Sequence, residues 1–158
     1  MKTYKEYTLE TLLLIITDRA IRSRIITRAV EKGVSSDEHH IREAIQLYSQ
    51  LKLYSNAAKL AERFGLKDDA IKFYYKAKLF GDVFRLDKQN GNNYDKFNLY
   101  YKITSSRNVS KITQKKTDLK RIVYSYETDS HIQDTINILR EKNAGYLYPY
   151  INFLESLL

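Results

Sequence analysis

The residues best suited to chemistry are two neighbouring histidines, His39 and His40, in the segment SSDEHHIRE. Imidazole and carboxylate groups are common metal ligands, and on a helix His39 shares a face with Glu43, four residues further on. The same letters also describe the start of a helix, with Ser36 as the cap and acidic side chains in the first turn. We favour the helix start. The third histidine, His131, is expected at a matching helix start, so we predict no metal site and no bound cofactor.

A second candidate is the basic segment Tyr101–Arg121, YKITSSRNVSKITQKKTDLKR. It holds seven Lys or Arg residues against one Asp, a net charge of +6, whereas the whole chain has a net charge of +8. Such a segment can be a solvated loop and helix face, which pairing with Glu127, Asp129 or Asp134 would favour. It can also be a docking strip for an acidic partner, whether a protein, an RNA or an anionic surface. The candidate partner-binding residues are Arg107, Lys111, Lys115, Lys116, Lys120 and Arg121.

The chain also has 14 tyrosines, and aromatic side chains beside basic residues can stack on the bases of single-stranded RNA. Many of the tyrosines fall on the apolar stripes of predicted helices, as Tyr48 and Tyr74 do, and these are expected in the core. Tyr75 lies off the stripe and is expected to be exposed beside Lys72 and Lys76. These last three residues complete the set of candidate partner-binding residues.

Nothing in the sequence indicates catalysis, and we predict that the protein is not an enzyme. There is no glycine-rich phosphate-binding loop and no nucleophile elbow, and the few glycines fall at expected helix ends. Without cysteine the chain can form neither a disulfide framework nor a thiolate metal site, which favours a cytoplasmic protein. The apolar run Leu12–Ile16 is too short to cross a membrane, so we expect a core helix there and no membrane insertion.

These candidate residues must be positioned by helices. The 158 residues are 43% hydrophobic with only five Gly and one Pro, a composition typical of a folded helical domain. The clearest organisation is an internal repeat, because residues 43–65 and 69–91 align at an offset of 26 with seven identical residues in 23. The identical pairs are Ala44 and Ala70, Ile45 and Ile71, Tyr48 and Tyr74, Lys52 and Lys78, Leu53 and Leu79, Leu60 and Leu86, and Gly65 and Gly91.

Each copy is predicted to form two helices joined by a tight turn. A helical hairpin cannot bury its apolar face alone, so stacked copies would share a continuous core. Leu60 and Leu86 are equivalent positions of that core and are expected to be buried. Because Asp87 replaces Ala61, the last helix of the second copy is expected to be short. The predicted caps and stops are Ser55 or Asn56 and Gly65 in the first copy, and Gly81, Asp82 and Gly91 in the second.

The stretches AIQLYSQLKLYSNAAKLAERFG and AIKFYYKAKLFGDVFRL resemble the helical hairpins of tetratricopeptide-like α-solenoids, including those of vesicle-coat and intraflagellar-transport subunits. The resemblance covers residues 41–91, about a third of the chain. The spacing of 26 departs from the 34 of the tetratricopeptide repeat, whose Trp and Pro positions have no counterpart here. The resemblance implies an all-α fold, a right-handed α-α superhelix of stacked helical hairpins, and a role in binding other proteins.

We therefore predict a single α-helical repeat domain over residues 1–158, with degenerate hairpins before and after the two clear copies. The last hairpin has its turn at Asn143–Gly145. The leading hypothesis is a non-enzymatic interaction or scaffold module that binds a peptide or helix of another protein in a groove lined by the first helices of the hairpins. The alternative is an RNA-binding protein that uses residues 101–121 and exposed tyrosines. The sequence leaves the oligomeric state open.

Overall fold

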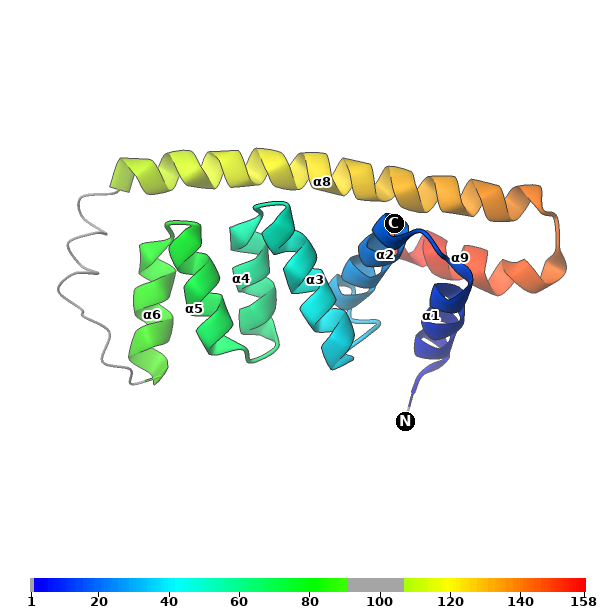
Figure 1. Cartoon of the computed structure of the whole chain (residues 1–158), viewed down its shortest axis with the longest axis horizontal. Helices are drawn as coiled ribbons and strands as arrows, with labels where there is room; N and C mark the ends of the chain where they lie inside the picture. The colour runs from blue at the N-terminus through cyan, green and yellow to red at the C-terminus, as the bar shows by residue number, and fades with distance from the viewer. Residues whose placement is uncertain (1, 91–106) are drawn as a thin grey trace. The chain divides into compact units, whose positions relative to one another are not determined.

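The computed structural model describes residues 2–90 and 107–158, without the side chains of residues 88–90, 107–114 and 117. Within these ranges the chain is helical and has no strand, which confirms the predicted all-α class. The elements are α1 (Tyr4–Ile15), α2 (Arg19–Glu31), α3 (Glu38–Gln50), α4 (Tyr54–Arg63), α5 (Lys67–Lys76), α6 (Phe80–Asn90), α8 (Arg107–Glu141), the 3-10 turn η1 (Gly145–Leu147) and α9 (Tyr148–Leu157) (Figure 1). None of the described helices is both long and apolar enough to cross a membrane.

The chain divides into two compact units. The terminal unit consists of residues 1–44 and 123–158, and the hairpin unit consists of residues 45–122. Two helices, α3 and α8, contribute residues to both units. Each unit has its own buried core, and we describe them in turn.

The hairpin unit repeats one helix-ending turn every 13 residues. Lys52, Gly65 and Lys78 all have a left-handed backbone conformation, with φ angles of 59°, 77° and 59°. The leucine after each of them donates its backbone N–H to a carbonyl five residues earlier, which is the Schellman arrangement. These bonds join Leu53 to Tyr48 (2.8 Å), Leu66 to Ala61 (2.8 Å) and Leu79 to Tyr74 (2.9 Å). The sequence offset of 26 residues therefore contains two helix-and-turn units of equal length.

Gly65 ends α4 in the left-handed conformation, as predicted, but the other predicted caps are wrong. Four of them lie inside first turns instead, namely Ser55 and Asn56 in α4 and Gly81 and Asp82 in α6. The N-cap of α4 is Leu53, which makes no side-chain capping bond. The position of the turn before α4 is set by Leu53, which follows the left-handed residue Lys52 and is only 1% exposed. The predicted stop at Gly91 lies outside the described residues.

The core of the hairpin unit is built from residues that recur at the same spacing as the turns. Small residues let neighbouring helices approach, and larger apolar residues fill the space between them. The buried small residues are Ala57, Ala70 and Val83, and the buried larger residues are Leu60, Phe73 and Leu86. α5 packs against both α4 and α6. Leu60 and Leu86 are thus core residues, as predicted.

Tyr48 and Tyr74 are also buried, which confirms their predicted packing role. The Tyr74 hydroxyl donates a hydrogen bond of 3.5 Å to the Glu62 carboxylate. Burial, and secondly the charge of Glu62, raise the pKa of Tyr74 to about 12, because both disfavour the phenolate. Tyr74 therefore stays neutral at physiological pH and serves as an apolar ring with one bonded hydroxyl.

The last helix of the second copy is not short, contrary to the prediction. α6 has 11 residues, one more than α4. Asp87, which stands where the first copy has Ala61, has no exposed surface. In the part of the chain that the structure describes, neither of its carboxylate oxygens has a hydrogen-bond partner. The helix forms despite this cost because Val83 and Leu86 bury apolar surface on the same side.

We expect Asp87→Ala to raise the free energy of unfolding by about 1–3 kcal/mol, because it removes a polar group buried without a partner. The variant also restores the alanine found in the first copy. Urea denaturation followed by far-UV circular dichroism measures the change. Asp68→Ala, at an exposed position of α5, is the control and should change stability by less than about 0.5 kcal/mol. A less stable Asp87→Ala protein would contradict the prediction.

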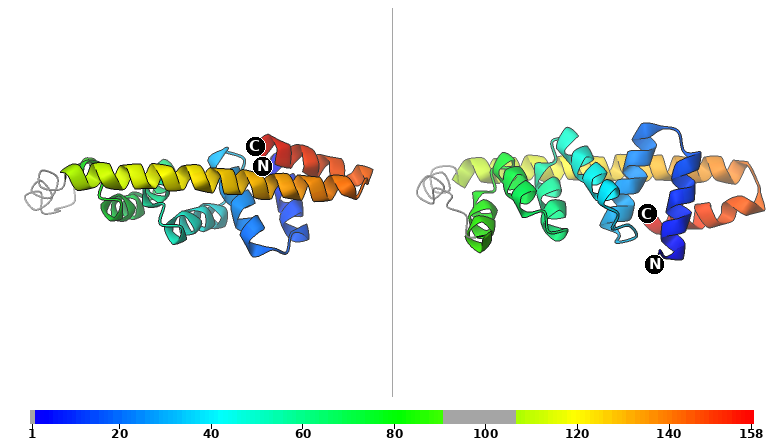
Figure 2. Two further views of the ribbon diagram at one scale, coloured as in Figure 1. Left: turned by 90° about the horizontal axis from the view of Figure 1, so that it is seen from above. Right: turned by 60° about the horizontal axis from the view of Figure 1, so that its bottom comes forward.

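In the terminal unit, α9 packs against α1 and α2 (Figure 2). α1 begins with a capping box, in which the Thr3 side chain accepts from the Glu6 N–H and the Glu6 carboxylate accepts from the Thr3 N–H. The predicted core helix is confirmed over the first half of the apolar run, since Leu12 and Leu13 are buried. Leu14 is 84% exposed because it lies on the opposite face of the same helix.

α8 is one unbroken helix of 35 residues, where we predicted a basic loop and helix followed by a separate hairpin (Figure 1). No Gly or Pro interrupts it. His131, predicted at a helix start, lies well inside α8, and its Nδ1 is 2.7 Å from the Glu127 carbonyl oxygen. The predicted last turn is confirmed at Asn143, which has a φ of 47° and leads into η1 and α9.

The C-terminal half of α8 is held by one buried face. Its residues follow helical spacing and are Tyr124, Thr128, Ile132, Thr135, Ile136 and Leu139. Burial raises the pKa of Tyr124 to about 12, although hydrogen bonds with Thr128 and Thr27 act in the opposite direction. This face explains why the basic segment continues as a helix, because the preceding residues extend a helix that is anchored further along.

Candidate interaction surface

The basic residues of α8 are exposed wherever their side chains are described. Lys115, Lys116, Lys120 and Arg121 are exposed, and none of them forms an ion pair with any described residue. Arg107 and Lys111 lie in the same helix, but their side chains are outside the description. These four side chains therefore present exposed positive charge along one helix.

The acidic residues that follow the basic segment do not neutralise it. Glu127 pairs with Arg24 of α2, and Asp129 pairs with Arg28 of α2 at 3.0 Å. Asp134 is exposed and forms no ion pair with a described residue. This pattern removes the internal pairing that would have favoured a purely solvated face.

Between the lysines and these acids lies an apolar stripe that was missed in the reading of the sequence. Its residues are Leu119, Ile122, Val123 and Tyr126, which are 65%, 64%, 65% and 77% exposed. They stand at positions i, i+3, i+4 and i+7, so they form one continuous line on the helix. Scattered apolar side chains are common on protein surfaces, but a contiguous line of four large ones is typical of a binding surface.

Val123 and Tyr126, the part of the stripe that belongs to the terminal unit, face away from the rest of that unit. Successive helix residues are rotated by about 100°, which places the stripe roughly opposite the buried line of Tyr124, Thr128 and Ile132. The helices packed against that buried line therefore cannot cover the stripe. The exposure of the stripe therefore follows from the helix geometry, once Tyr124, Thr128 and Ile132 are buried on the other side.

Charge changes sign along the stripe's own face. Lys115 and Lys116 lie within about 70° of its centre on the N-terminal side. Further along, on the C-terminal side, the same face holds Asp134 and Glu141, and all four residues are exposed. Arg121 belongs to the opposite face and is not part of this surface. We call the stripe with Lys115, Lys116, Asp134 and Glu141 the α8 surface.

Two buried arginines of α2 fix the orientation of α8. Arg28 donates to the Leu157 carbonyl oxygen at 3.1 Å and lies 3.0 Å from the Asp129 carboxylate. Arg24 pairs with Glu127 and donates to the Ala20 carbonyl oxygen at 3.1 Å. Both arginines are only 9% exposed. They hold the acids of α8 toward α2 and so turn the opposite face of α8 outward.

The remaining predicted binding residues lie on α5 and at its end. Lys72, Tyr75 and Lys76 are exposed, as expected. Two of them already contact aromatic rings of their own unit: Tyr75 packs edge-on against Phe80 at 5.5 Å, and the Lys76 Nζ lies 5.5 Å from the Tyr54 ring centroid. These contacts give both side chains a structural role.

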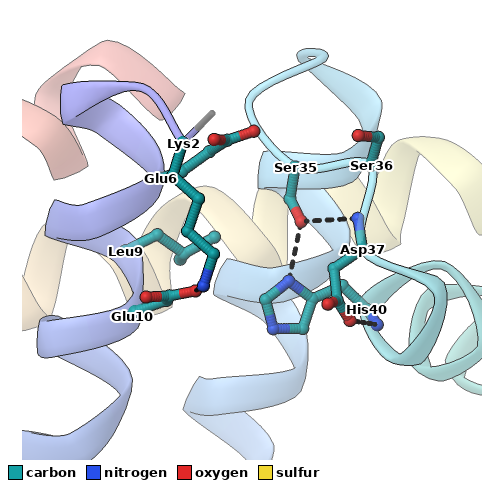
Figure 3. Close-up of a pocket in the computed structure, with 8 residues that line it drawn as sticks. All are labelled: Lys2, Glu6, Leu9, Glu10, Ser35, Ser36, Asp37 and His40. Carbon is teal, nitrogen blue, oxygen red and sulfur yellow. Dashed lines mark hydrogen bonds and ion pairs between the residues drawn. The ribbon is translucent and has the colours of Figure 1, made fainter.

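A second feature is a cavity of about 240 Å³ between α1 and the start of α3 (Figure 3). It is lined by Lys2, Glu6, Leu9, Glu10, Ser35, Ser36, Asp37 and His40. Its charged groups already have partners, since Lys2 pairs with Glu10, Glu6 completes the α1 cap, and Asp37 caps α3. The predicted cap Ser36 is therefore wrong, because the Asp37 carboxylate accepts from the His39 N–H at 2.9 Å. Burial favours the neutral acid, but backbone hydrogen bonds, led by that of His40, outweigh it and lower the pKa of Asp37.

The cavity also holds a serine–imidazole contact, with Ser35 Oγ 2.7 Å from His40 Nδ1. A nucleophile needs exposure and nearby N–H donors for an oxyanion. Ser35 is only 4% exposed, and its oxygen accepts from the Asp37 N–H at 3.3 Å. The N–H groups of His39 and His40 at the start of α3 are bonded to Asp37. This arrangement is a helix cap, which does not support hydrolytic chemistry.

Metal chemistry finds no support in the ranges 2–90 and 107–158, where no three His, Asp or Glu side chains gather around one point. Two of the histidines have other contacts, since His40 Nδ1 lies 2.7 Å from Ser35 Oγ and His131 Nδ1 lies 2.7 Å from the Glu127 carbonyl oxygen. The α8 surface is thus the strongest functional candidate among the described residues. Comparison with known proteins found no family model, no curated protein and no solved structure that matches the chain.

Proposed function

We propose that the protein is a non-enzymatic interaction or scaffold module built from helical hairpins, in the manner of a tetratricopeptide-like right-handed α-α superhelix. The observation that carries the proposal is the exposed stripe of Leu119, Ile122, Val123 and Tyr126 on α8. Apolar residues at helical spacing are the pattern by which one helix receives another helix or an amphipathic peptide. The predicted groove along the first helices of the hairpins stays a prediction.

RNA binding is the second candidate, and the exposed lysines beside the stripe favour it. RNA binding uses Lys and Arg for contacts with the phosphates and aromatic side chains for stacking on the bases, and Tyr126 offers one exposed ring. Leu119, Ile122 and Val123 contribute nothing to phosphate recognition. Since the aliphatic residues form the centre of the surface, we favour a protein partner.

We expect the double variant Ile122→Ser and Val123→Ser to retain at least about 10-fold less partner protein than the parent, because each removed side chain contributes roughly 1–3 kcal/mol of apolar burial. The full chain is immobilised and exposed to lysate of its native host, half of it treated with nuclease, and the bound proteins are quantified by mass spectrometry. Leu14→Ser, which changes another exposed apolar residue, is the control and should retain what the parent retains.

The triple variant Lys115→Glu, Lys116→Glu and Lys120→Glu separates the two candidates. For a protein partner it should weaken retention modestly, whereas for RNA it should abolish binding of a labelled single-stranded oligonucleotide at low salt. RNA affinity should also fall log-linearly with salt concentration. Retention that is unchanged by the serine variant but lost on nuclease treatment would overturn the protein-binding proposal in favour of RNA.

A further inference from the structure

We propose that the α8 surface binds the same surface of a second copy of this chain, with the two α8 helices antiparallel across a twofold axis. This inference rests on the proposed function, because it names the partner of the surface described above. A twofold interface must be self-complementary, so that each residue meets its counterpart on the other copy. The α8 surface meets this requirement in its shape and in its charge.

The apolar stripe is symmetric about its own midpoint. The midpoint lies between Ile122 and Val123, and Leu119 and Tyr126 stand at equal distances on either side. In an antiparallel pair centred there, Ile122 of one copy faces Val123 of the other, and Leu119 faces Tyr126. No side chain therefore meets its own copy. Ile122 packs on the similar-sized Val123, and the large Tyr126 ring covers the smaller Leu119.

The charges on the α8 surface favour the antiparallel arrangement over the parallel one. The N-terminal end carries Lys115 and Lys116, and the C-terminal end carries Asp134 and Glu141, all exposed. In the antiparallel pair centred between Ile122 and Val123, Asp134 of each copy lies opposite position 111 of the other, about one helical turn from the exposed Lys115. A parallel pair places Lys115 and Lys116 beside their own copies, where like charges repel. Asp134 of the second copy thus comes within reach of Lys115, which has no ion-pair partner among the described residues.

The size of the surface predicts a weak dimer. Four apolar side chains from each copy form a contact smaller than a standard protein interface, which places the dissociation constant on the order of 10–100 μM. Such a dimer forms at high local concentration and dissociates on dilution. An interface of this strength suits a scaffold protein that associates reversibly.

The first test measures mass against protein concentration by sedimentation equilibrium of the full chain. The apparent mass should rise from 18.7 kDa toward twice that value between roughly 1 and 500 μM. Ile122→Ser with Val123→Ser should remain monomeric over the same range, with unchanged far-UV circular dichroism because serine has a helix propensity close to those of the residues it replaces. Leu14→Ser should dimerise like the parent. A parent chain that stays monomeric up to about 500 μM overturns the inference.

The second test fixes the direction of the helices. The chain has no cysteine, so Lys115→Cys and Ser130→Cys each introduce a single reactive thiol at exposed positions that flank the stripe at equal distances from its midpoint. In the antiparallel pair the thiol at position 115 of one copy lies beside the thiol at position 130 of the other, whereas like positions are about 22 Å apart. A short bismaleimide should therefore cross-link a mixture of the two variants and neither variant alone. Cross-linking of each variant with itself would overturn the antiparallel arrangement.

The two proposals fail in different ways. Suppose the parent stays monomeric but retains lysate proteins that the Ile122→Ser and Val123→Ser double variant does not retain. The inference about the second copy is then wrong, and the proposed function stands. If the parent dimerises equally well with these serines in place, the dimer uses another surface and the inference is overturned. A dimer that the serines abolish and the mixed cross-link confirms supports it.

Discussion

Truncation of Leu60 or Leu86 to alanine is expected to lower the free energy of unfolding by about 2–5 kcal/mol at either position. Both leucines are buried, with 5% and 1% of their surface exposed. They occupy equivalent places in α4 and α6, where the flanking residues Ala57 and Val83 are too small to close the cavity that the truncation leaves. Urea denaturation monitored by far-UV circular dichroism measures the loss.

Leu14→Ala is the matched control, because it makes the same chemical change at a leucine that is 84% exposed. It should cost less than about 0.5 kcal/mol. The dependence of the unfolding free energy on urea concentration should be compared between variants as well. Stacked hairpins can unfold in steps, and stepwise unfolding lowers the apparent slope. If Leu60→Ala or Leu86→Ala changed the free energy of unfolding as little as Leu14→Ala does, the helix that holds that leucine would not be packed as described.

The residues that were predictable from the sequence are those whose role depends on local periodicity. The repeated apolar positions indicated helices and placed Leu60, Leu86, Tyr48 and Tyr74 in the core. Gly65 was predictable because a left-handed residue at a helix end is usually glycine. In each case one stretch of about 15 residues contains enough information to identify the face that is buried.

The turns at Lys52 and Lys78 were not predictable in the same way. A left-handed lysine is unfavourable by itself, and propensity instead pointed to the Gly81–Asp82 pair and to Ser55 as turn and cap residues. Leu53, which follows Lys52, is only 1% exposed, and Leu79, which follows Lys78, is partly buried. The tertiary packing of one leucine therefore outweighed the local preference. The recurring pairs Lys-Leu, Gly-Leu and Lys-Leu at 13-residue spacing were the signal for this turn.

The candidate surface was predictable only in part. Charge composition identified the basic residues, but we predicted a separate hairpin after the basic segment, where α8 continues without interruption. The absence of Gly and Pro between Arg107 and Glu141 was the signal for one long helix. Once α8 is continuous, Leu119, Ile122, Val123 and Tyr126 fall on one line. Which face of α8 is buried depends on contacts with α2 that no local pattern contains.

The contacts with α2 lead to the second large prediction. Arg28→Ala is expected to lower the free energy of unfolding by about 3 kcal/mol, because it removes one partner of a buried ion pair. Arg28 is only 9% exposed, and its guanidinium contacts three groups, namely the Asp129 carboxylate at 3.0 Å, the Leu157 carbonyl oxygen at 3.1 Å and the Glu31 carboxylate at 3.7 Å. Asp129 is about half exposed and regains water when Arg28 is lost, which keeps the cost toward the lower end of the range for buried pairs.

Three variants separate the charge of Arg28 from its packing. Arg28→Met keeps most of the apolar volume and should cost less than Arg28→Ala, because a hydrophobic replacement of a buried ion is often tolerated. A double-mutant cycle of Arg28→Ala with Asp129→Asn should give a coupling free energy of about 0.5–3 kcal/mol. Arg42→Ala, which breaks the exposed pair with Glu38, is the control and should cost less than about 0.5 kcal/mol.

Loss of Arg28 should also affect the α8 surface, although Arg28 itself is not part of that surface. When Asp129 is no longer held toward α2, the C-terminal half of α8 is anchored by its apolar face alone, and the stripe of Leu119, Ile122, Val123 and Tyr126 is less firmly turned outward. Hydrogen exchange measured by mass spectrometry should therefore show faster exchange in the α8 segment after Val123 in Arg28→Ala than in Arg42→Ala. Equal exchange in the two variants, together with a cost below about 1 kcal/mol for Arg28→Ala, would mean that the apolar face holds α8 by itself and that the arginine contacts do not orient it.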